Sequence, residues 1–550
     1  MSNIVKHLFN LLATGICFSL CACSSSPSIN EDGTVDIKMS VVWNGLSSMK
    51  PSNDAENTRI AKIIKEKTGV NLKINWVNGN ENENLVRIFA TGKNMPDCIM
   101  APYWGGGDAC SDTIRQASKD GLLIPLDDYI NKYENLKDAY STGVSQNFIN
   151  NELSVEEFNN KKYIIPMHTP ENENEMQNWG YTVYCRKDIL EALDVDASSI
   201  NSSQKVYELA EKIKNGNFKD VNGNPVIPAS CWGNGWSYET YLNSFKVRGF
   251  TNIVNKGDHF EWSADQQYLE EEIKFMQKMV SNGLFDKTAF SHSESQALGK
   301  HVVGGVGLTS AHYPYIKNAL KNNLYKDHPE MEYVPVGPIL DYNNQPIMPS
   351  TLVEKSGYYG FACLSVTKDC KNVEALMKYL NFINSNEGKY LAYLGEKDVD
   401  YYLDDNNAPH MTEQFFNNEK ENPSYSYDNG IDSYFTFGVS RVPFNTFDEA
   451  RNETPDKTYE TVKNMYPLKL VEGTRASSFD EQYKNIEYVQ NILESVDYAL
   501  TIESAYCASS QEEALQKLEK YRQAIHNKNY LDDYLDWLYS QIGNRTDILF

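Results

Sequence analysis

Apolar and polar residues alternate with two different periods after the first 35 residues of the chain. Apolar side chains occupy every second position of 70–77, and 36–43 is rich in β-forming residues, so both stretches are predicted to be strands. Between them, 54–67 carries three isoleucines at helical spacing and is followed by a Thr-Gly pair. This stretch is predicted to be a helix that ends at the glycine.

The same order continues with a helix predicted at 83–91, closed by Gly92, and a short apolar strand at 97–101. A β-α-β-α-β order predicts an α/β fold in which helices cover a parallel sheet. Ligands of such sheets bind outside the carboxyl ends of the strands. We therefore expect the loops after Trp43 and after Ala101 to line a cleft.

The apolar run 8–20 follows Lys6 and is shorter than the roughly 20 residues that a membrane-spanning helix needs. It has the features of an export signal, with small residues before the cleavage point. Its end, Leu-Cys-Ala-Cys, resembles the bacterial lipobox, which implies cleavage before Cys23 and acylation of that thiol. A polar tether follows at 23–35. The alternative, a buried N-terminal helix of a cytosolic protein, fits this polar run less well.

At 550 residues, the chain is too long for one ordinary core, so two or more lobes are expected. The net charge is −24, and no block rich in Lys and Arg interrupts the sequence. These features argue against nucleic acid and anionic lipid as binding partners. No other apolar run is long enough to span a membrane, so the expected membrane attachment is the lipid alone.

Seven of the ten cysteines lie beyond the predicted signal and lipidation site: Cys98, Cys110, Cys185, Cys231, Cys363, Cys370 and Cys507. They form no Cys-x-x-Cys pair, which argues against a zinc site. An odd number cannot pair completely within one chain. Disulfides such as Cys98–Cys110 or Cys363–Cys370 remain open, and buried free thiols are the favoured interpretation.

Several stretches, in their order along the chain, resemble the bacterial extracellular solute-binding proteins of ABC transporters, of the maltose-binding-protein-like, carbohydrate-type class. They are LVRIFATGKNMPDCIM, GLLIPLDDYI, KKYIIPMHTP, WGYTVYCRKDILEALDV, KHVVGGVGLTSAHYPYI, EYVPVGPI and MKYLNFINSNEGKYLAYLGEKDVDYYLDDNN. The last resembles a Tyr-Gly-x-x-Gly-x-x-Tyr-like stretch of the large lipoprotein subfamily. Gly395 provides its first glycine, whereas Asp398 replaces the second.

The resemblance implies a two-lobed, type II periplasmic-binding-protein-like α/β fold. Each lobe would contain a mainly parallel sheet flanked by helices, with a helical C-terminal extension that packs on both lobes. The expected divisions are signal 1–22, tether 23–35, first lobe 36–178 and 336–394, and second lobe with the extension 179–335 and 395–550. Such lobes close on a ligand like a hinge.

Aromatic residues make up 12% of the chain, and many stand beside Gly, Asn or Pro in predicted loops. Their flat faces suit the apolar faces of sugar rings. The candidate ligand-binding aromatics are Trp43, Tyr103, Trp104, Trp232, Trp236, Tyr313, Tyr358 and Tyr359. Packing in the core is the alternative for each one taken alone.

The charged candidates are Asp108 and Glu239, which neighbour the aromatic loops and could accept hydrogen bonds from sugar hydroxyls. Arg186 and Asp188 are expected to form an ion pair at the start of a helix.

A calcium loop of the EF-hand kind is a further candidate, with Asp220, Asn222 and Asn224 at its first, third and fifth positions. Pro225 stands where the sharp turn needs glycine, and Cys231 replaces the bidentate glutamate. A plain Asn-Gly turn is therefore the alternative, and no other cofactor is expected.

These observations predict a monomeric, lipid-anchored binding protein on the outer face of the cytoplasmic membrane, which passes a carbohydrate, expected to be an oligosaccharide, to ABC permease subunits. No enzymatic activity is expected, because no Gly-x-Ser-x-Gly or His-Glu-x-x-His motif occurs. A peptide or another oligomeric polar ligand is the alternative within binding proteins. A glycan-capture lectin without transport and a glycan hydrolase, which would need two flanking carboxylates, are the other classes considered.

Overall fold

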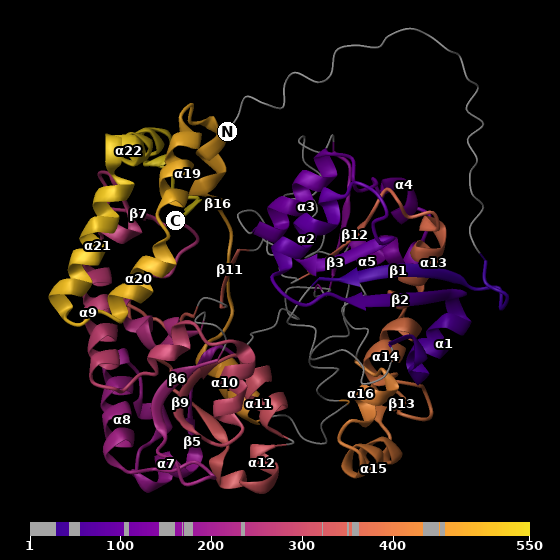
Figure 1. The fold of residues 1–550 in the computed structure, drawn as a ribbon, viewed down its shortest axis with the longest axis horizontal. Helices are drawn as coiled ribbons and strands as arrows, with labels where there is room; N and C mark the ends of the chain where they lie inside the picture. Colours follow the sequence, from indigo (N-terminus) through magenta and orange to yellow (C-terminus); the bar gives the residue numbers. More distant parts are fainter. Residues whose placement is uncertain are drawn as a thin grey trace.

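The fold contains two α/β lobes, shown in Figure 1. The structure is a computed structural model that describes residues 29–42, 55–103, 109–141, 160–167, 169, 180–232, 237–321, 323–348, 351–354, 362–432, 450 and 457–550. Each lobe is built around one sheet and one hydrophobic core.

The first lobe contains a five-stranded sheet with the order β2-β1-β3-β12-β4. Its strands are β1 (Val35–Val41), β2 (Val70–Trp76), β3 (Cys98–Pro102), β4 (Ile164–Met167) and β12 (Ala362–Val366). β1 pairs in parallel with both β2 and β3, whereas β12 is antiparallel to both of its neighbours. Four strands therefore run in one direction and β12 runs against them.

The second lobe contains a four-stranded sheet with the order β10-β5-β9-β6. Its strands are β5 (Thr182–Arg186), β6 (Ile227–Cys231), β9 (Val306–Ala311) and β10 (Tyr333–Val336). β6 and β9 are parallel, and β5 runs against the other three. In each sheet all strands but one run in the same direction, which agrees with the predicted mainly parallel sheets.

The elements predicted from periodicity are present at the start of the first lobe. The helix α1 (Arg59–Thr68) buries Ile60 and Ile64, and Thr58 caps it through a hydrogen bond from the Ala61 amide. Gly69 ends the helix with φ 69°, a left-handed conformation that glycine adopts without strain. The next helix, α2 (Glu81–Ala90), begins two residues before the predicted start.

The two hydrophobic cores define which segments belong to each lobe. The first contains buried residues from 37–167 and 362–450, and the second from 183–348 and 459–548. The chain therefore passes between the cores three times. β11 (Leu352–Glu354) lies within the second passage and pairs in parallel with β15 (Lys469–Val471), which follows the third passage.

The predicted start of the second first-lobe segment, at residue 336, is wrong. Val336, Ile339 and Met348 are buried in the second core, because β10 pairs with β5 and the segment after it is tied to the same lobe. The Asn243 side-chain amide donates hydrogen bonds to the carbonyls of Ile339, at 2.8 Å, and Ile347, at 3.0 Å. The chain re-enters the first core only with β12.

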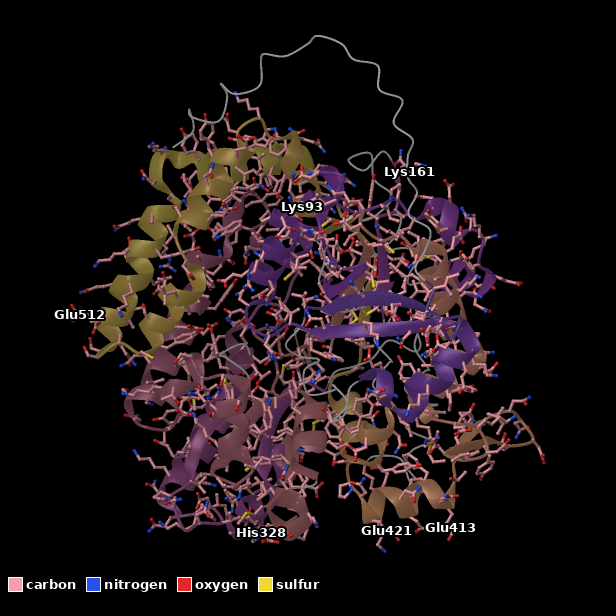
Figure 2. The ribbon with its side chains drawn as sticks, turned by 45° about the vertical axis from the view of Figure 1, so that its right-hand side comes forward. Lys93, Lys161, His328, Glu413, Glu421 and Glu512 are labelled. Carbon is pink, nitrogen blue, oxygen red and sulfur yellow. The ribbon has the colours of Figure 1, made fainter. Side chains whose placement is uncertain are left out.

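The predicted assignment of 395–450 to the second lobe is also wrong for the described part of that segment. Tyr401, Met411 and Phe415 are buried in the first core. They belong to β13 (Tyr401–Leu403), β14 (Pro409–Met411) and α15 (Glu413–Glu421). Figure 2 shows Glu413 and Glu421 of α15 at the end of the first lobe, pointing into solvent.

The C-terminal extension is helical, as predicted. It contains α19 (Ile486–Ser495), α20 (Tyr498–Tyr506), α21 (Gln511–Ile525) and α22 (Tyr530–Ile542). Their buried apolar side chains belong to the second core, so the expected packing on both lobes is not observed among the described residues.

The turn after Gly395 has a positive φ at both glycine positions of the family-like pattern. Gly395 has φ 96°, and a side chain there would collide with the carboxylate of Asp400. Asp398, which replaces the second glycine, has φ 65°. Aspartate tolerates the left-handed region better than most residues, so it can occupy this position of the turn.

All seven cysteines beyond the predicted lipidation site are free thiols, and all except Cys507 are buried. The free-thiol interpretation is confirmed for these residues. Within the described residues, no helix is both long and apolar enough to cross a membrane.

Candidate functional site

The carboxyl ends of β1 and β3 bring two of the predicted loops to one edge of the first sheet. Val41 lies opposite Met100 in the register, and the Val42 amide donates to the Met100 carbonyl at 2.8 Å. Figure 1 shows β1 and β2 pointing toward the second lobe. The loops that leave β1 and β3 therefore start side by side on the side of the sheet that faces the other lobe.

Tyr103 is the predicted ligand-binding residue of these two loops that the structure describes, and only 1% of its surface is exposed. In this conformation its ring is part of the first core and presents no free face to solvent. Six of the other predicted residues, Trp43, Trp104, Asp108, Trp236, Tyr358 and Tyr359, lie outside the described residues, as does Cys23.

The ends of β6 and β9 form the corresponding edge of the second sheet. The Trp232 amide donates to the Ser310 carbonyl at 2.8 Å, so the residues after the two strands start together. The Trp232 ring stacks on Tyr315, with centroids 5.6 Å apart and planes 7° apart, and lies 4.6 Å from the His301 ring. Trp232 is 2% exposed, so its ring belongs to the core that underlies this edge of the sheet.

Tyr313 follows β9 at the start of α11 (Tyr313–Lys321) and is also buried. Its ring lies 5.5 Å from that of Tyr459 in α18 (Lys457–Met465). A side chain at Gly180 would approach the Tyr313 Cβ to 2.6 Å. Tyr313 therefore contacts the residues with which the chain enters the second lobe after two of its passages between the cores, near 180 and in α18.

Three partly exposed aromatic residues at this edge were not singled out from the sequence: Tyr181, His312 and Tyr315. The His312 ring lies 5.0 Å from Tyr181 and 5.2 Å from Tyr315, so the rings continue the Trp232 stack toward the surface. Tyr181 lies just before β5, whereas His312 and Tyr315 lie close together, directly after β9 and in α11. The run His-Tyr-Pro-Tyr at 312–315, around the predicted Tyr313, is a sequence signal that could have indicated two of them.

The two histidines beside this ring cluster are uncharged at neutral pH. Desolvation lowers the pKa of His312 to about 3 and is the main cause that lowers the pKa of His301 to about 4. The two histidines therefore add no positive charge to these rings, and Lys317, whose ammonium lies 5.8 Å from the centre of the Tyr313 ring, is a nearby cation.

Glu239 is the one predicted acid of the site that the structure describes. It lies in the helix η7 (Tyr238–Phe245), and its side chain is 46% exposed. Arg248 lies 3.6 Å away and donates to the Asn243 side chain at 2.6 and 3.0 Å. Glu239 thus keeps a solvent-facing carboxylate that can accept hydrogen bonds, beside a guanidinium that balances part of its charge.

The predicted calcium loop is an exposed, hydrogen-bonded turn. One oxygen of Asp220 accepts the amides of Asn222 and Asn224, at 2.9 and 2.7 Å, and the other accepts the Asn224 side chain. The turns at Asp341 and Asp404 have the same two backbone hydrogen bonds to one carboxylate oxygen.

These contacts do not fit a calcium cage well. Asp220 is the only carboxylate at the three predicted positions, and the Cys231 thiol is buried beside the Ala289 carbonyl. Calcium prefers six to eight oxygen ligands. The geometry favours the plain turn, and calcium binding stays a prediction. No group of three or more His, Cys, Asp or Glu residues suited to a metal ion occurs in the described part of the chain.

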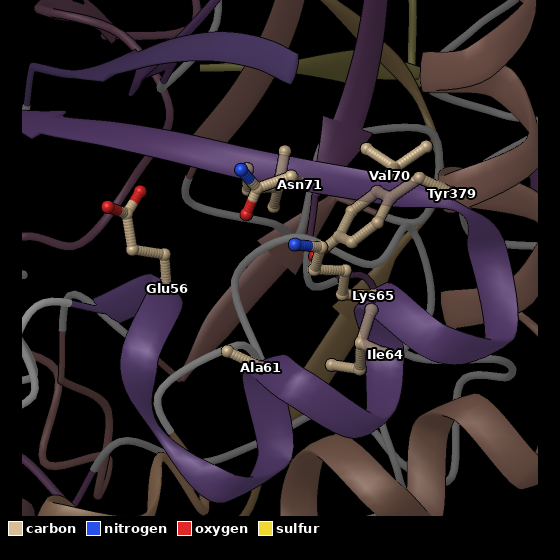
Figure 3. A pocket seen from close by; sticks show the side chains of 8 residues that line it. Glu56, Ala61, Ile64, Lys65, Val70, Asn71 and Tyr379 are labelled. Atoms are coloured by element: carbon tan, nitrogen blue, oxygen red, sulfur yellow. The ribbon is translucent and has the colours of Figure 1, made fainter. Parts of the chain in front are cut away.

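A small pocket between α1 and β2 lies away from these strand ends (Figure 3). Its walls include Ile64 and Lys65 of α1, Val70 and Asn71 at the start of β2, and Tyr379. These β2 residues are at the amino end of the strand, opposite the edge where ligands of such sheets bind. We do not assign a ligand to it.

The family model of the bacterial extracellular solute-binding proteins matches residues 53–390. The fructooligosaccharide ABC transporter substrate-binding protein FusA of Streptococcus pneumoniae serotype 4 is 26% identical over 292 residues, which are 50% of this chain and 51% of FusA. The chain thus matches about half the length of FusA. Lipoprotein LipO of Bacillus subtilis is 21% identical over 419 residues, 72% of this chain and 73% of LipO.

Solved structures share the fold over almost the whole chain. The alginate-binding protein AlgQ2, without calcium, has a TM-score of 0.63 at 15% identity, covering 92% of this chain and 98% of its own. FusA of S. pneumoniae in complex with kestose has a TM-score of 0.60 at 17% identity, covering 92% and 99%. Both are type II solute-binding proteins, which confirms the predicted fold. With a family model that matches more than half of its length, the chain belongs to the bacterial extracellular solute-binding proteins.

Proposed function

We propose that this protein is the lipid-anchored, extracellular substrate-binding protein of an ABC importer and that it captures a carbohydrate, most simply an oligosaccharide, between its lobes. The observation that carries the proposal is the family match on a chain that passes three times between two separate cores. FusA, a relative, is a fructooligosaccharide-binding protein of this kind.

The arrangement suits capture by closure. Eight of the ten predicted ligand-binding residues follow the carboxyl ends of β1, β3, β6 and β9, two strands from each sheet, whereas Tyr358 and Tyr359 precede β12 in the sequence. A sugar held at the strand ends of both sheets would contact the two lobes at once only when the lobes close. Ligand binding then stabilises the closed form, which a permease can distinguish from the open form. No chemical step is needed, so we assign no enzymatic activity.

The lipid anchor on Cys23, release of the signal 1–22 and residence on the outer face of the cytoplasmic membrane belong to the same proposal. They are supported by the lipobox-like sequence and by the similarity to the lipoprotein LipO. The proposed partners are the carbohydrate and two permease subunits, and the binding protein is proposed to act as a monomer.

Thermal unfolding of residues 24–550 against mono- and oligosaccharides, with peptides as the comparison, tests the proposal. A ligand of the folded state raises the midpoint once its concentration exceeds the dissociation constant. We expect a shift with one glycan series and no change in the length of that glycan. A shift with peptides alone would favour the alternative ligand class, and shortening of the glycan would indicate a hydrolase.

The variants Trp104→Ala and Trp236→Ala locate the binding surface. Loss of a stacking platform is expected to weaken binding by about 1 to 3 kcal/mol for each residue. Unchanged affinity in both variants would contradict the assignment of these loops while leaving the family intact. Absence of permease genes beside the gene for this chain would favour a surface lectin over an importer.

A further inference from the structure

The first lobe begins close to the proposed lipidation site. Ile29 forms an isolated β-bridge with Val35, the first residue of β1, and Cys23 lies only six positions before Ile29. A chain of six residues spans at most about 20 Å even when it is fully extended. A lipid on Cys23 would therefore keep this end of the first lobe within about 20 Å of the membrane.

The turn at 29–35 is fixed to the first lobe by its side chains. The Asn30 side chain donates to the Asp36 carboxylate at 2.9 Å. Asp32 forms an ion pair with Lys65 of α1 at 2.7 Å. Because these contacts tie the turn to a strand and a helix, the reach of the tether limits the position of the whole lobe.

This turn leads to the amino end of β1, at one edge of the first sheet. The Lys38 amide donates to the Asp97 carboxylate at 2.7 Å, just before β3. The Thr367 amide donates to the Asp97 carbonyl at 3.1 Å, just after β12. Because β12 runs against both of its neighbours, its carboxyl end meets the amino ends of β3 and β4. This edge is opposite the strand ends that form the candidate site.

The same edge continues to β4 through further backbone contacts. The Lys368 amide donates to the Leu122 carbonyl at 2.9 Å. The Leu126 amide donates to the carbonyl of Lys162, just before β4, at 2.7 Å. The segments that make up the edge are therefore 93–97, 119–128, 160–162 and 367–371.

Four exposed lysines on these segments form no ion pair with a described residue. We call them the lysine edge: Lys93, Lys161, Lys368 and Lys371. Figure 2 shows Lys93 and Lys161 at the upper side of the first lobe, away from the helix α15 at its lower end. An ammonium group without an ion-pair partner can contact an anion outside the protein.

The acids of the four segments leave the edge slightly positive. The segments contain six lysines and five aspartates. Asp127 forms an ion pair with Lys162 at 3.1 Å, and the carboxylates of Asp97 and Asp369 each accept a backbone amide. The other two aspartates, Asp120 and Asp128, are exposed. The whole chain carries a charge of −24, so an anionic surface repels the chain overall but attracts the lysine edge.

We propose that the lysine edge rests on the anionic lipid headgroups of the membrane in which Cys23 is anchored. The inference rests on the proposed function, because it requires the lipid on Cys23, and goes beyond it by assigning the face of the first lobe that meets the membrane. The short tether brings this edge to the lipid, and its lysines set the orientation. The strand-end loops lie at the opposite edge of the sheet and stay turned away from the headgroups.

Lysine acylation on vesicles tests the orientation. Residues 23–550 with Cys507→Ser are coupled through Cys23 to a maleimide lipid, since the other six cysteines are buried free thiols. The vesicles contain phosphatidylcholine alone, or phosphatidylcholine with phosphatidylglycerol to supply anionic headgroups. A water-soluble reagent then acylates the exposed lysines, and mass spectrometry of the digested protein gives the rate at each one.

We expect the four lysines of the lysine edge to react about fivefold more slowly on the anionic vesicles than on the neutral ones, the factor expected for one basic residue near an anionic surface. Lys520, an exposed lysine of α21 on the second lobe, is the control and should react equally on both. High salt should remove the difference, because it screens the charges.

Charge reversal tests the lysines while the tether stays unchanged. Lys93→Glu combined with Lys368→Glu should remove the protection of Lys161 and Lys371. Lys520→Glu, also at an exposed position, is the matched control and should leave that protection as it was. Protection that survives the double reversal contradicts a role for the lysine edge.

Equal reaction rates of the lysine edge on both kinds of vesicle, or stronger protection of Lys520 than of the edge, also overturn the proposal. Carbohydrate binding by residues 24–550 is measured without vesicles, so the proposed capture of a sugar stands in these cases. If the protein isolated from its cells carries no acyl chain on Cys23, the proposed anchor fails, and this inference fails with it.

Discussion

The guanidinium of Arg59 donates hydrogen bonds to both carboxylate oxygens of Asp400, at 2.9 and 2.7 Å, across 341 positions of the sequence. The Asp400 side chain is fully buried, whereas that of Arg59 is 28% exposed and also donates to Glu396 at 2.8 Å. The desolvated guanidinium keeps a raised pKa because Asp400 and Glu396 stabilise its charge. This pair holds the segment after Gly395 against α1, which is why that segment belongs to the first lobe.

Asp400→Ala is therefore expected to destabilise the first lobe by about 3 kcal/mol, because it removes charge-assisted hydrogen bonds and leaves Arg59 half-buried without its main partner. Urea unfolding measures the change. Asp405→Ala, at an exposed position five residues away, is the control and should change stability by less than about 0.5 kcal/mol. Equal stability of the two variants would contradict the anchoring role.

His526 forms a second charged link, between the C-terminal helices and the second lobe. Its ring nitrogens lie 3.1 Å from Asp265 and 2.7 Å from Asp532. These partners, Asp265 first, raise its pKa from the ordinary 6.5 to about 9. The folded state therefore keeps a proton that the unfolded state releases between these two values.

The stabilisation from His526 is consequently complete below about pH 6.5 and is lost as the pH rises through about 9. We expect the unfolding midpoint of the unaltered chain to exceed that of His526→Gln by the largest margin near neutral and lower pH, and by little above about pH 9. Differential scanning calorimetry of both proteins across this range gives the result. A margin that grows with pH would contradict a raised pKa of His526 in the folded state.

Trp232 provides a test of how a predicted site residue acts from within the core. Its ring is buried between Tyr315 and His301, so Trp232→Ala should cost about 3 to 5 kcal/mol in unfolding free energy. Because the ring lies beneath the strand-end surface, Trp232→Phe should recover part of the stability and most of the ligand affinity. Loss of affinity in Trp232→Phe with unchanged stability would show instead a direct contact with ligand.

Periodicity predicted the local elements well, because each depends on neighbouring residues. Gly69 ends α1 through its own left-handed conformation, and the alternation in 70–77 agrees with β2. The lobe boundaries were predicted less well, since they depend on contacts between distant residues. Nothing near position 336 indicates that Asn243 holds the following carbonyls, and nothing near 400 indicates Arg59.

In the candidate site, too, the sequence predicted local positions but not the contacts between distant residues. The rule that ligands bind at strand ends directed attention to the residues after β6 and β9, and Trp232 and Tyr313 lie there. The rule could not distinguish a buried ring from an exposed one. That difference is set by partners such as Tyr315 and Tyr459, which are brought together only by the folded chain.

Cys507 is the exposed member of seven free thiols, which makes thiol reactivity a simple test of the fold. In the chain 24–550, we expect one cysteine to react with a disulfide reagent under native conditions and the remaining six only after unfolding. Desolvation, with the charge of Glu503, raises the pKa of Cys507, so even this thiol should react more slowly at neutral pH than a free cysteine. Cys507→Ser is the control and should abolish the native reaction. Fast reaction of a second thiol under native conditions would mean that one of the two cores opens more readily than its burial implies. If fewer than six further thiols react after unfolding without reductant, two of the cysteines form a disulfide.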